Sequence, residues 1–154
     1  LEKIISNSIQ IINLGNFEVD MKKNVIMISA DYQSTLFSEA ASASFHADGW
    51  QVYSLGDMSS SIDVLFDLDL QKFLTKVWKS GMGIMVIVIF SSTAESMKFF
   101  AESVNSIKLK SRKNLYLAVC GDMKKNTEIK ADLVEEDIQA VLQWSQTTFE
   151  SFIS

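Results

Sequence analysis

The chain of 154 residues contains no proline, one cysteine and one histidine. A single cysteine excludes an internal disulfide framework and suits a reducing compartment, so we expect a cytoplasmic protein. One cysteine and one histidine also cannot supply the ligands of a typical zinc site. No apolar run reaches the roughly 18 residues of a membrane span, and no basic segment followed by an apolar one begins the chain. The missing proline indicates no particular function.

The composition is that of an ordinary globular protein. Hydrophobic residues make up 47% of the chain and charged residues 21%, which excludes a disordered polypeptide. The formal net charge is −5, with acids and bases interspersed, so we expect no nucleic-acid partner. The length suits one domain with a sizeable core. Because the first residue is Leu1 and not methionine, we expect a piece of a longer protein.

The segment Asn24 to Gly56 organises the chain. It begins with the apolar run 25–29, which predicts a strand buried on both faces. A polar turn at 31–35 leads into a predicted helix that ends near Gly49, and a second strand is predicted at 50–55. Strand, helix and strand form one βαβ unit. In open sheets of such units, ligands bind beyond the carboxyl ends of the strands, which makes Asp31 to Thr35 the natural site.

The rest of the chain continues the alternation of strands and helices. The run 84–90 is rich in β-branched residues and predicts a central strand. Ser92 with Glu95 forms a capping pattern for a helix to about Ile107, followed by a basic surface loop at Lys108 to Lys113. Further predicted elements are a helix after Ser59 to Ser61, strands at 115–120 and 131–134, and a last helix preceded by acids at 135–137. The alternation predicts a parallel sheet covered by helices on both faces.

The first residues form a separate segment. Residues 1–14 place isoleucines along one helical face, so we predict an N-terminal helix within a segment 1–23 and a main domain at 24–154. A docked helix, a linker and a dimerising segment all suit this pattern. We favour a helix that packs on its own sheet or on a second copy.

Short motifs follow four of the predicted strands: Asp31-x-Gln33-x-x-Leu36, Ser54-Leu55-Gly56, Ser91-Ser92-Thr93 and Cys120-Gly121. Because these motifs occur in this order and at similar spacing, the chain resembles the cobalamin-binding domain. This domain is a module of corrinoid carrier proteins and of some light or redox regulators. The resemblance covers roughly Asn24 to Phe152. It implies a flavodoxin-like (Rossmann-like) three-layer sandwich with a five-stranded parallel sheet. It also implies a cofactor site at these positions: Asp31, Gln33, Leu36, Ser54, Gly56, Ser91, Ser92, Cys120 and Gly121.

The departures from the family pattern bear on the cofactor. The family writes Asp-x-His-x-x-Gly in the first motif, where the histidine coordinates cobalt and the aspartate orients it. Here Gln33 replaces that histidine, and Leu36 is expected to occupy the room that the family glycine leaves for the nucleotide tail. Cys120 replaces the first of two family glycines, and its side chain is expected to narrow the opposite wall of the cofactor site. We therefore expect no cofactor, with cobalamin or haem bound without a histidine ligand as the alternative.

Neither His46 nor Cys120 suggests catalysis. His46 lies near the end of the first predicted helix, away from the ligand edge, and we expect a half-exposed surface residue. Cys120 ends a buried strand and is expected to fill core space, although it stands at the edge where a thiolate ligand would stand. A response-regulator receiver, which shares the fold, needs an aspartate after the third strand, where this chain has Ser91. No nucleophile with a histidine base can be assembled, so we predict that the domain is not an enzyme.

Large apolar side chains are numerous for one small core. Most are expected inside, but together with the N-terminal segment they leave room for a partner surface or a homodimer: Tyr32, Trp50, Tyr53, Trp78, Met82, Met85, Tyr116 and Trp144. The sequence therefore predicts a non-enzymatic sensory, regulatory or protein-interaction domain of a larger signalling or transcription-regulating protein. The alternative is a tetrapyrrole-binding sensor or carrier.

Overall fold

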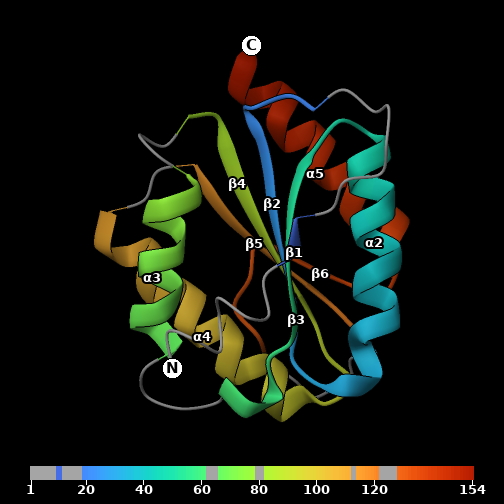
Figure 1. Ribbon diagram of the computed structural model, residues 1–154, viewed down its shortest axis with the longest axis vertical. Coiled ribbons are helices and arrows are strands. Elements are labelled where there is room, and N and C mark those ends of the chain that lie inside the picture. Colours follow the sequence, from blue (N-terminus) through green and yellow to red (C-terminus); the bar gives the residue numbers. More distant parts are fainter. Residues whose placement is uncertain (1–9, 12–18, 62–65, 79–81, 112–113, 122–127) are drawn as a thin grey trace.

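A parallel sheet of five strands forms the centre of the molecule (Figure 1). The computed structural model describes residues 10–11, 19–61, 66–78, 82–111, 114–121 and 128–154. The strands lie in the order β3-β2-β4-β5-β6, which is the flavodoxin-like order. The prediction of a flavodoxin-like α/β fold is thus confirmed. The strands are β2 (Lys23–Ser29), β3 (Gln51–Asp57), β4 (Ile84–Phe90), β5 (Leu115–Cys120) and β6 (Leu133–Glu135).

Helices cover both faces of the sheet and make three layers (Figure 1). On one face lie α2 (Thr35–Ala47) and α5 (Ile138–Ile153), and on the other lie α3 (Phe66–Val77) and α4 (Ala94–Ser111). Two short 3₁₀ turns, η1 (Tyr32–Ser34) and η2 (Ser59–Ser61), follow β2 and β3. No helix in the described segments is long and apolar enough to cross a membrane.

The central strands carry long apolar runs, 25–28 in β2 and all of β4, because both of their faces are covered. Every residue of β2 and β4 is buried. Along β2, Ile26 and Ile28 face α3 and α4, whereas Val25 and Met27 face α2 and α5. Such continuous apolar runs are typical of parallel strands between two layers of helices.

The first described residues differ from the prediction. Gln10 and Ile11 form β1, a two-residue strand antiparallel to β3, where the sequence predicted a helix. The period of isoleucines suits a helix, but pairing with the open edge of β3 satisfies backbone groups that a lone edge leaves exposed. The rest of segment 1–14 lies outside the described residues.

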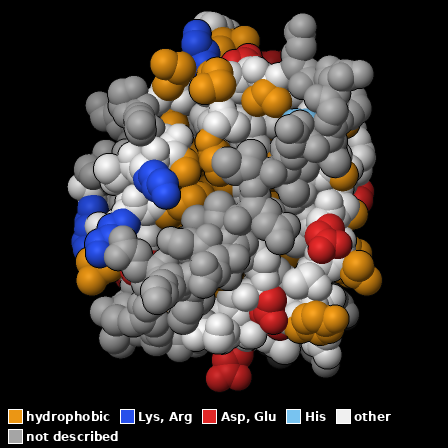
Figure 2. All heavy atoms as spheres, viewed as in Figure 1, with side chains coloured by type: hydrophobic (Ala, Val, Ile, Leu, Met, Phe, Trp, Pro, Cys, Tyr) orange, Lys and Arg blue, Asp and Glu red, His pale blue; other side chains and the backbone are white. Residues whose placement is uncertain are grey.

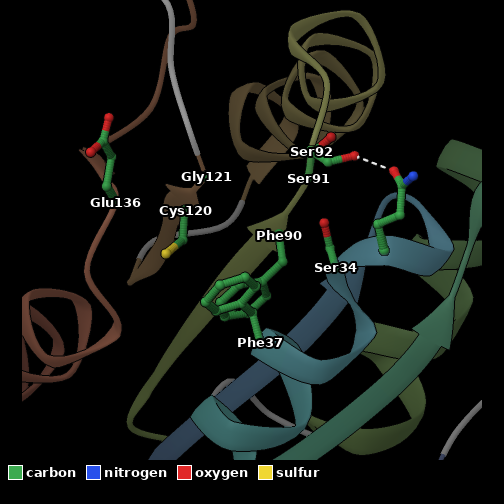
Figure 3. A pocket seen from close by; sticks show the side chains of 9 residues that line it. Ser34, Phe37, Phe90, Ser91, Ser92, Cys120, Gly121 and Glu136 are labelled. Atoms are coloured by element: carbon green, nitrogen blue, oxygen red, sulfur yellow. Dashed lines mark hydrogen bonds between the residues drawn. The ribbon is translucent and has the colours of Figure 1, made fainter.

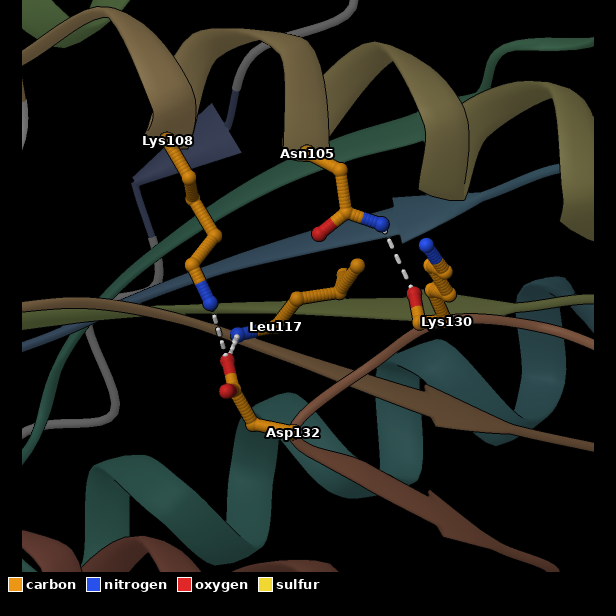
Figure 4. Close-up of polar contacts among 5 residues, drawn as sticks. All are labelled: Asn105, Lys108, Leu117, Lys130 and Asp132. Carbon is orange, nitrogen blue, oxygen red and sulfur yellow. Dashed lines mark hydrogen bonds and ion pairs between the residues drawn. The ribbon is translucent and has the colours of Figure 1, made fainter.

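The end of α4 also differs from the prediction (Figure 4). Residues Lys108 to Ser111 are helical and not a loop, and lysines in a last turn interact favourably with the helix dipole. Lys108 forms an ion pair with Asp132, whose carboxylate also accepts a hydrogen bond from the backbone N–H of Leu117 at 2.8 Å. These contacts tie the segment before β6 to β5 and α4. Residues 112–113 of the expected loop lie outside the described part.

The large apolar side chains divide between core and surface. Trp50, Tyr53, Trp78 and Met85 are buried, Tyr116 and Trp144 are half-buried, and Tyr32 and Met82 are exposed. Core packing thus accounts for most of them, as expected. The exposed ones fall at the two ends of the sheet, in the segment after β2 and the segment before β4.

Candidate functional site

A cavity of about 390 Å³ opens at the carboxyl ends of the strands, which we call the carboxyl edge (Figure 3). It lies beside the switch point between β2 and β4, where the order of successive strands along the sheet reverses and ligands of this fold class bind. Its walls come from the start of α2, the ends of β4 and β5, and the segment before α5. The lining residues are Gln33, Ser34, Phe37, Phe90, Ser91, Ser92, Cys120, Gly121 and Glu136.

Asp31 connects the two sides of the switch point. One carboxylate oxygen accepts a hydrogen bond from the N–H of Ser34, at 3.0 Å, and caps η1. The other accepts from the backbone N–H and the hydroxyl of Ser92, each at 2.8 Å, sixty-one positions along the chain. Asp31 therefore fastens the start of α2 to the β4–α4 connection and is not aimed at a ligand.

The carboxyl of Asp31 is held in its charged form. Partial burial raises its pKa, but hydrogen bonds from Ser92 and Ser34 outweigh that effect and hold the pKa below its usual value. A permanent carboxylate suits a structural clamp, since hydrogen bonds to an ionised acceptor are the stronger kind.

Gln33 and Ser92 meet at the mouth of the cavity (Figure 3). The Ser92 hydroxyl lies 2.8 Å from the side-chain oxygen of Gln33 and 2.8 Å from Asp31. Having one proton, it donates to only one of them at a time. Ser92 is not the helix cap that the sequence suggested: Thr93 precedes α4, and its hydroxyl accepts from the N–H of Ser96 at 3.3 Å. Ser92 and Thr93 were both candidate caps. Because the Ser92 hydroxyl is in contact with Asp31, Thr93 is the residue that caps α4.

Cys120 and Gly121 form the far wall. Cys120 is buried as predicted, and burial, together with the nearby acids Asp137, Glu135 and Glu136, raises the pKa of its thiol to about 11. A thiol in this state is a weak nucleophile and a poor metal ligand. A side chain at Gly121 would place its Cβ 2.3 Å from the carbonyl oxygen of Ser91, so only glycine allows this close approach of the two connections.

The structure brings some of the predicted site residues together and not others. Gln33, Ser91, Ser92, Cys120 and Gly121 line the cavity, and Asp31 borders it. Ser54 and Gly56 do not line it.

Ser54 is a buried residue within β3, paired with Met27. Gly56 has a φ of +67° where β3 carries one residue more than β2 between two paired positions. Such a bulge favours glycine, so its role is structural.

The expectation for Leu36 is wrong. Its side chain is 75% exposed and does not enter the cavity, which the next residue, Phe37, lines instead. Successive helical residues point about 100° apart, so an error of one position decides between cavity and solvent. Sequence reasoning also missed Phe90 and Glu136, whereas Ser34 lies within the predicted site segment 31–35 but was not singled out. Phe90 ends the predicted strand 84–90, and Glu136 is one of the acids predicted before the last helix, but no motif marked either of them as a site residue.

The expectation for His46 is wrong in one respect. It lies in the last turn of α2, at the opposite end of the sheet from the cavity, as predicted. However, it is only 4% exposed and not a surface residue. The chain turns directly after it toward Trp50, with the backbone N–H of Gly49 donating to the His46 carbonyl and that of Trp50 to the Phe45 carbonyl.

Three large apolar side chains stand in solvent beside the cavity. Tyr32, Leu36 and Phe37, which we call the edge patch, are 77%, 75% and 61% exposed. In Figure 2, hydrophobic side chains project at the lower right, over the start of α2. Phe37 belongs both to the edge patch and to the cavity lining, and Tyr32 and Leu36 lie within five positions of it along the chain.

The donor atoms at the carboxyl edge do not fit a metal-ligated tetrapyrrole. The carboxamide of Gln33 contacts Ser92, the thiol of Cys120 is held protonated, and His46 is at the other end of the sheet. Among the described residues, no group of three or more His, Cys, Asp and Glu side chains is arranged to hold a metal ion.

Comparison with known proteins identifies no relative, so a proposal for the function rests on the fold and on the site. No model of a protein family matches the sequence, and no curated protein matches it closely enough to count as a relative.

Proposed function

We propose that the domain is a non-enzymatic protein-interaction module of a larger sensory or regulatory protein, and that it binds its partner at the carboxyl edge. A cobalamin-binding domain that has lost its cobalt ligand is the origin that the sequence resemblance favours. The observation that carries the proposal is the edge patch, three exposed apolar side chains of which one, Phe37, also lines the open cavity.

The edge patch has the composition of a binding hot spot. Aromatic residues are enriched at the centres of interfaces, and contiguous exposed apolar surface marks interaction sites. Fully burying one large apolar side chain contributes about 1.5–3 kcal/mol. A partner that covers Tyr32, Leu36 and Phe37 would therefore gain several kcal/mol from side chains that contribute little to the fold.

The chemistry of the cavity supports a non-catalytic role. Its lining contributes serine hydroxyls, a carboxamide, a protonated thiol and one carboxylate. Asp31, whose carboxylate accepts hydrogen bonds from the hydroxyls of Ser91 and Ser92, has a lowered pKa and is therefore a weak base for activating either serine. The described lining contains no histidine or lysine that could serve as a stronger base.

Selection from a random peptide library on the immobilised 154-residue chain tests the proposal. Counter-selection uses a Tyr32→Ser, Leu36→Ser double variant, which changes only exposed side chains and is expected to keep its free energy of unfolding within about 0.5 kcal/mol. Leu109→Ser, at a leucine that is 89% exposed on α4, is the matched control. We expect peptides that bind wild type and the control but not the double variant. If no peptide discriminates among them, the proposed function is wrong.

Tetrapyrrole binding is a second candidate because the cavity lies where the family resemblance places its cofactor and contains five of the predicted residues. Absorbance titration with hydroxocobalamin and with haemin separates the two. We expect no saturable shift of either spectrum, since none of the described residues at the carboxyl edge has a donor placed to coordinate the metal. A shifted band that saturates near one equivalent would favour the tetrapyrrole-binding alternative.

A further inference from the structure

We infer that the segment recognised at the carboxyl edge is a basic, apolar peptide, in which one apolar side chain enters the cavity and a flanking lysine or arginine pairs with Glu136. This inference rests on the proposed function and specifies the chemistry of the partner.

The cavity is built for an apolar group of modest size. Phe37, Phe90 and Cys120 supply its apolar walls, and polar groups from Gln33 and Ser92 stand at one side. Its volume of about 390 Å³ is near the lower end of ligand pockets, which span roughly 300–1,000 Å³. A single side chain or a small ring suits this space better than a large cofactor.

The described surface around the cavity is acidic. The connection from β5 to β6 contains Lys124, Lys125 and Lys130, and its residues 122–127 lie outside the described part. The other connections that leave the strands at this edge (29–37, 56–61, 90–96 and 135–139) contain no lysine or arginine. Figure 2 shows the same polarity, with acidic side chains around the lower end and lysines at the top and on the left. The acids in these connections are Asp31, Asp57, Glu95, Glu135, Glu136 and Asp137.

Several of these acids already have structural roles, but Glu136 does not. Asp31, Asp57 and Asp137 accept hydrogen bonds from nearby backbone N–H groups. Glu136 lines the cavity, is exposed, and its carboxylate makes no hydrogen bond to the described residues. It is therefore the carboxylate available to a cation beside the cavity.

The negative potential reaches the cavity wall. Glu135, Glu136 and Asp137 each contribute to raising the pKa of the Cys120 thiol, which lies on that wall. The same potential disfavours phosphates and carboxylates as ligands and attracts a peptide that carries lysine or arginine.

The test uses the peptides that depend on the edge patch. We expect them to share an apolar residue with a lysine or arginine within two positions, and to bind more weakly as the NaCl concentration rises. For a synthetic peptide of this kind, isothermal calorimetry should give a dissociation constant about three- to tenfold higher for Glu136→Gln, as loss of one interfacial ion pair predicts. Glu95→Gln, at an exposed acid of the same edge that does not line the cavity, should change it by less than about twofold.

Each outcome separates the inference from the proposed function. Edge-dependent peptides with no excess of lysine and arginine, or equal affinity for wild type and Glu136→Gln, would overturn the inference and leave the proposed function standing. The absence of any edge-dependent peptide would overturn both. Sedimentation of the chain alone, showing self-association that Leu36→Ser removes, would identify a second copy as the occupant and overturn the basic peptide.

Discussion

The two ends of the sheet are built in contrasting ways. At the amino ends of the strands, two polar side chains are buried and hydrogen-bonded: the Asn24 amide nitrogen, with two N–H groups, lies within hydrogen-bond distance of the carbonyls of Met21, Met82 and Ile84. The Lys23 ammonium donates to the Asp48 carbonyl and lies over aromatic rings. At the carboxyl ends, one clamp at Asp31 leaves a cavity and exposed apolar side chains beside it. The amino end closes the fold, and the carboxyl end is free to bind.

The largest effect is expected at Gly83, one of two glycines in tight places at opposite ends of the sheet. Gly83, at the amino end, has a φ of +73°, and a Cβ there would lie 2.1 Å from the carbonyl oxygen of Lys22. Gly83→Ala should lower the free energy of unfolding by about 3 kcal/mol or more, because both strain and collision act on backbone. Urea denaturation measures it.

Gly121→Ala is the matched variant at the carboxyl end. Its Cβ would meet the Ser91 carbonyl at 2.3 Å, but its φ lies outside the left-handed region, so we expect a smaller loss of about 2 kcal/mol. A larger loss for Gly121→Ala than for Gly83→Ala would reverse the comparison and make the carboxyl end the more rigid one.

An intermediate effect is expected at Asn24. Asn24→Ala leaves three carbonyls of the amino end without their side-chain donor, and the site is buried, so the loss should be about 2–3 kcal/mol in urea denaturation. Asn105→Ala is the control, because Asn105 donates to the Lys130 carbonyl in an exposed position (Figure 4) and should cost less than about 1 kcal/mol. Equal losses would mean that burial does not distinguish the amino end.

The smallest effect is expected at Asp31. Asp31→Asn removes a charged acceptor from partly exposed hydrogen bonds, so the loss at pH 7 should be about 1–2 kcal/mol. The folded pKa of Asp31 is lowered, so its contribution is present above the usual aspartate pKa and fades as pH falls through the folded value. The difference between wild type and variant should therefore shrink below about pH 4.

Urea denaturation at pH 7 and at pH 3 measures this change. Asp57→Asn, at an acid with a single hydrogen bond to the Ser59 N–H at 2.9 Å, serves as the control and should show a smaller difference at pH 7. A difference between wild type and Asp31→Asn that grows toward pH 3 would contradict the clamp.

Sequence patterns predicted the buried strands correctly, but they did not predict where one helix ends or which way individual side chains of a helix point. The apolar runs of β2, β4 and β5 were found because both faces of these strands are covered. The end of α4 was missed because lysines suit a helix end as well as a loop. In the site, the segment was right, but Leu36 and Phe37 exchanged roles, since which of two adjacent helical residues enters a cavity depends on how the helix sits on the sheet.

The contact between Asp31 and Ser92 has a consequence for regulation. These residues meet only when β2 and β4 are paired, so the proposed recognition surface would exist in the folded chain and not in the unfolded one. A partner bound there adds to stability by mass action, by about 1.4 kcal/mol at a free concentration ten times its dissociation constant. The domain would then resist unfolding and proteolysis more strongly in the complex, and its abundance in a cell would follow that of its partner.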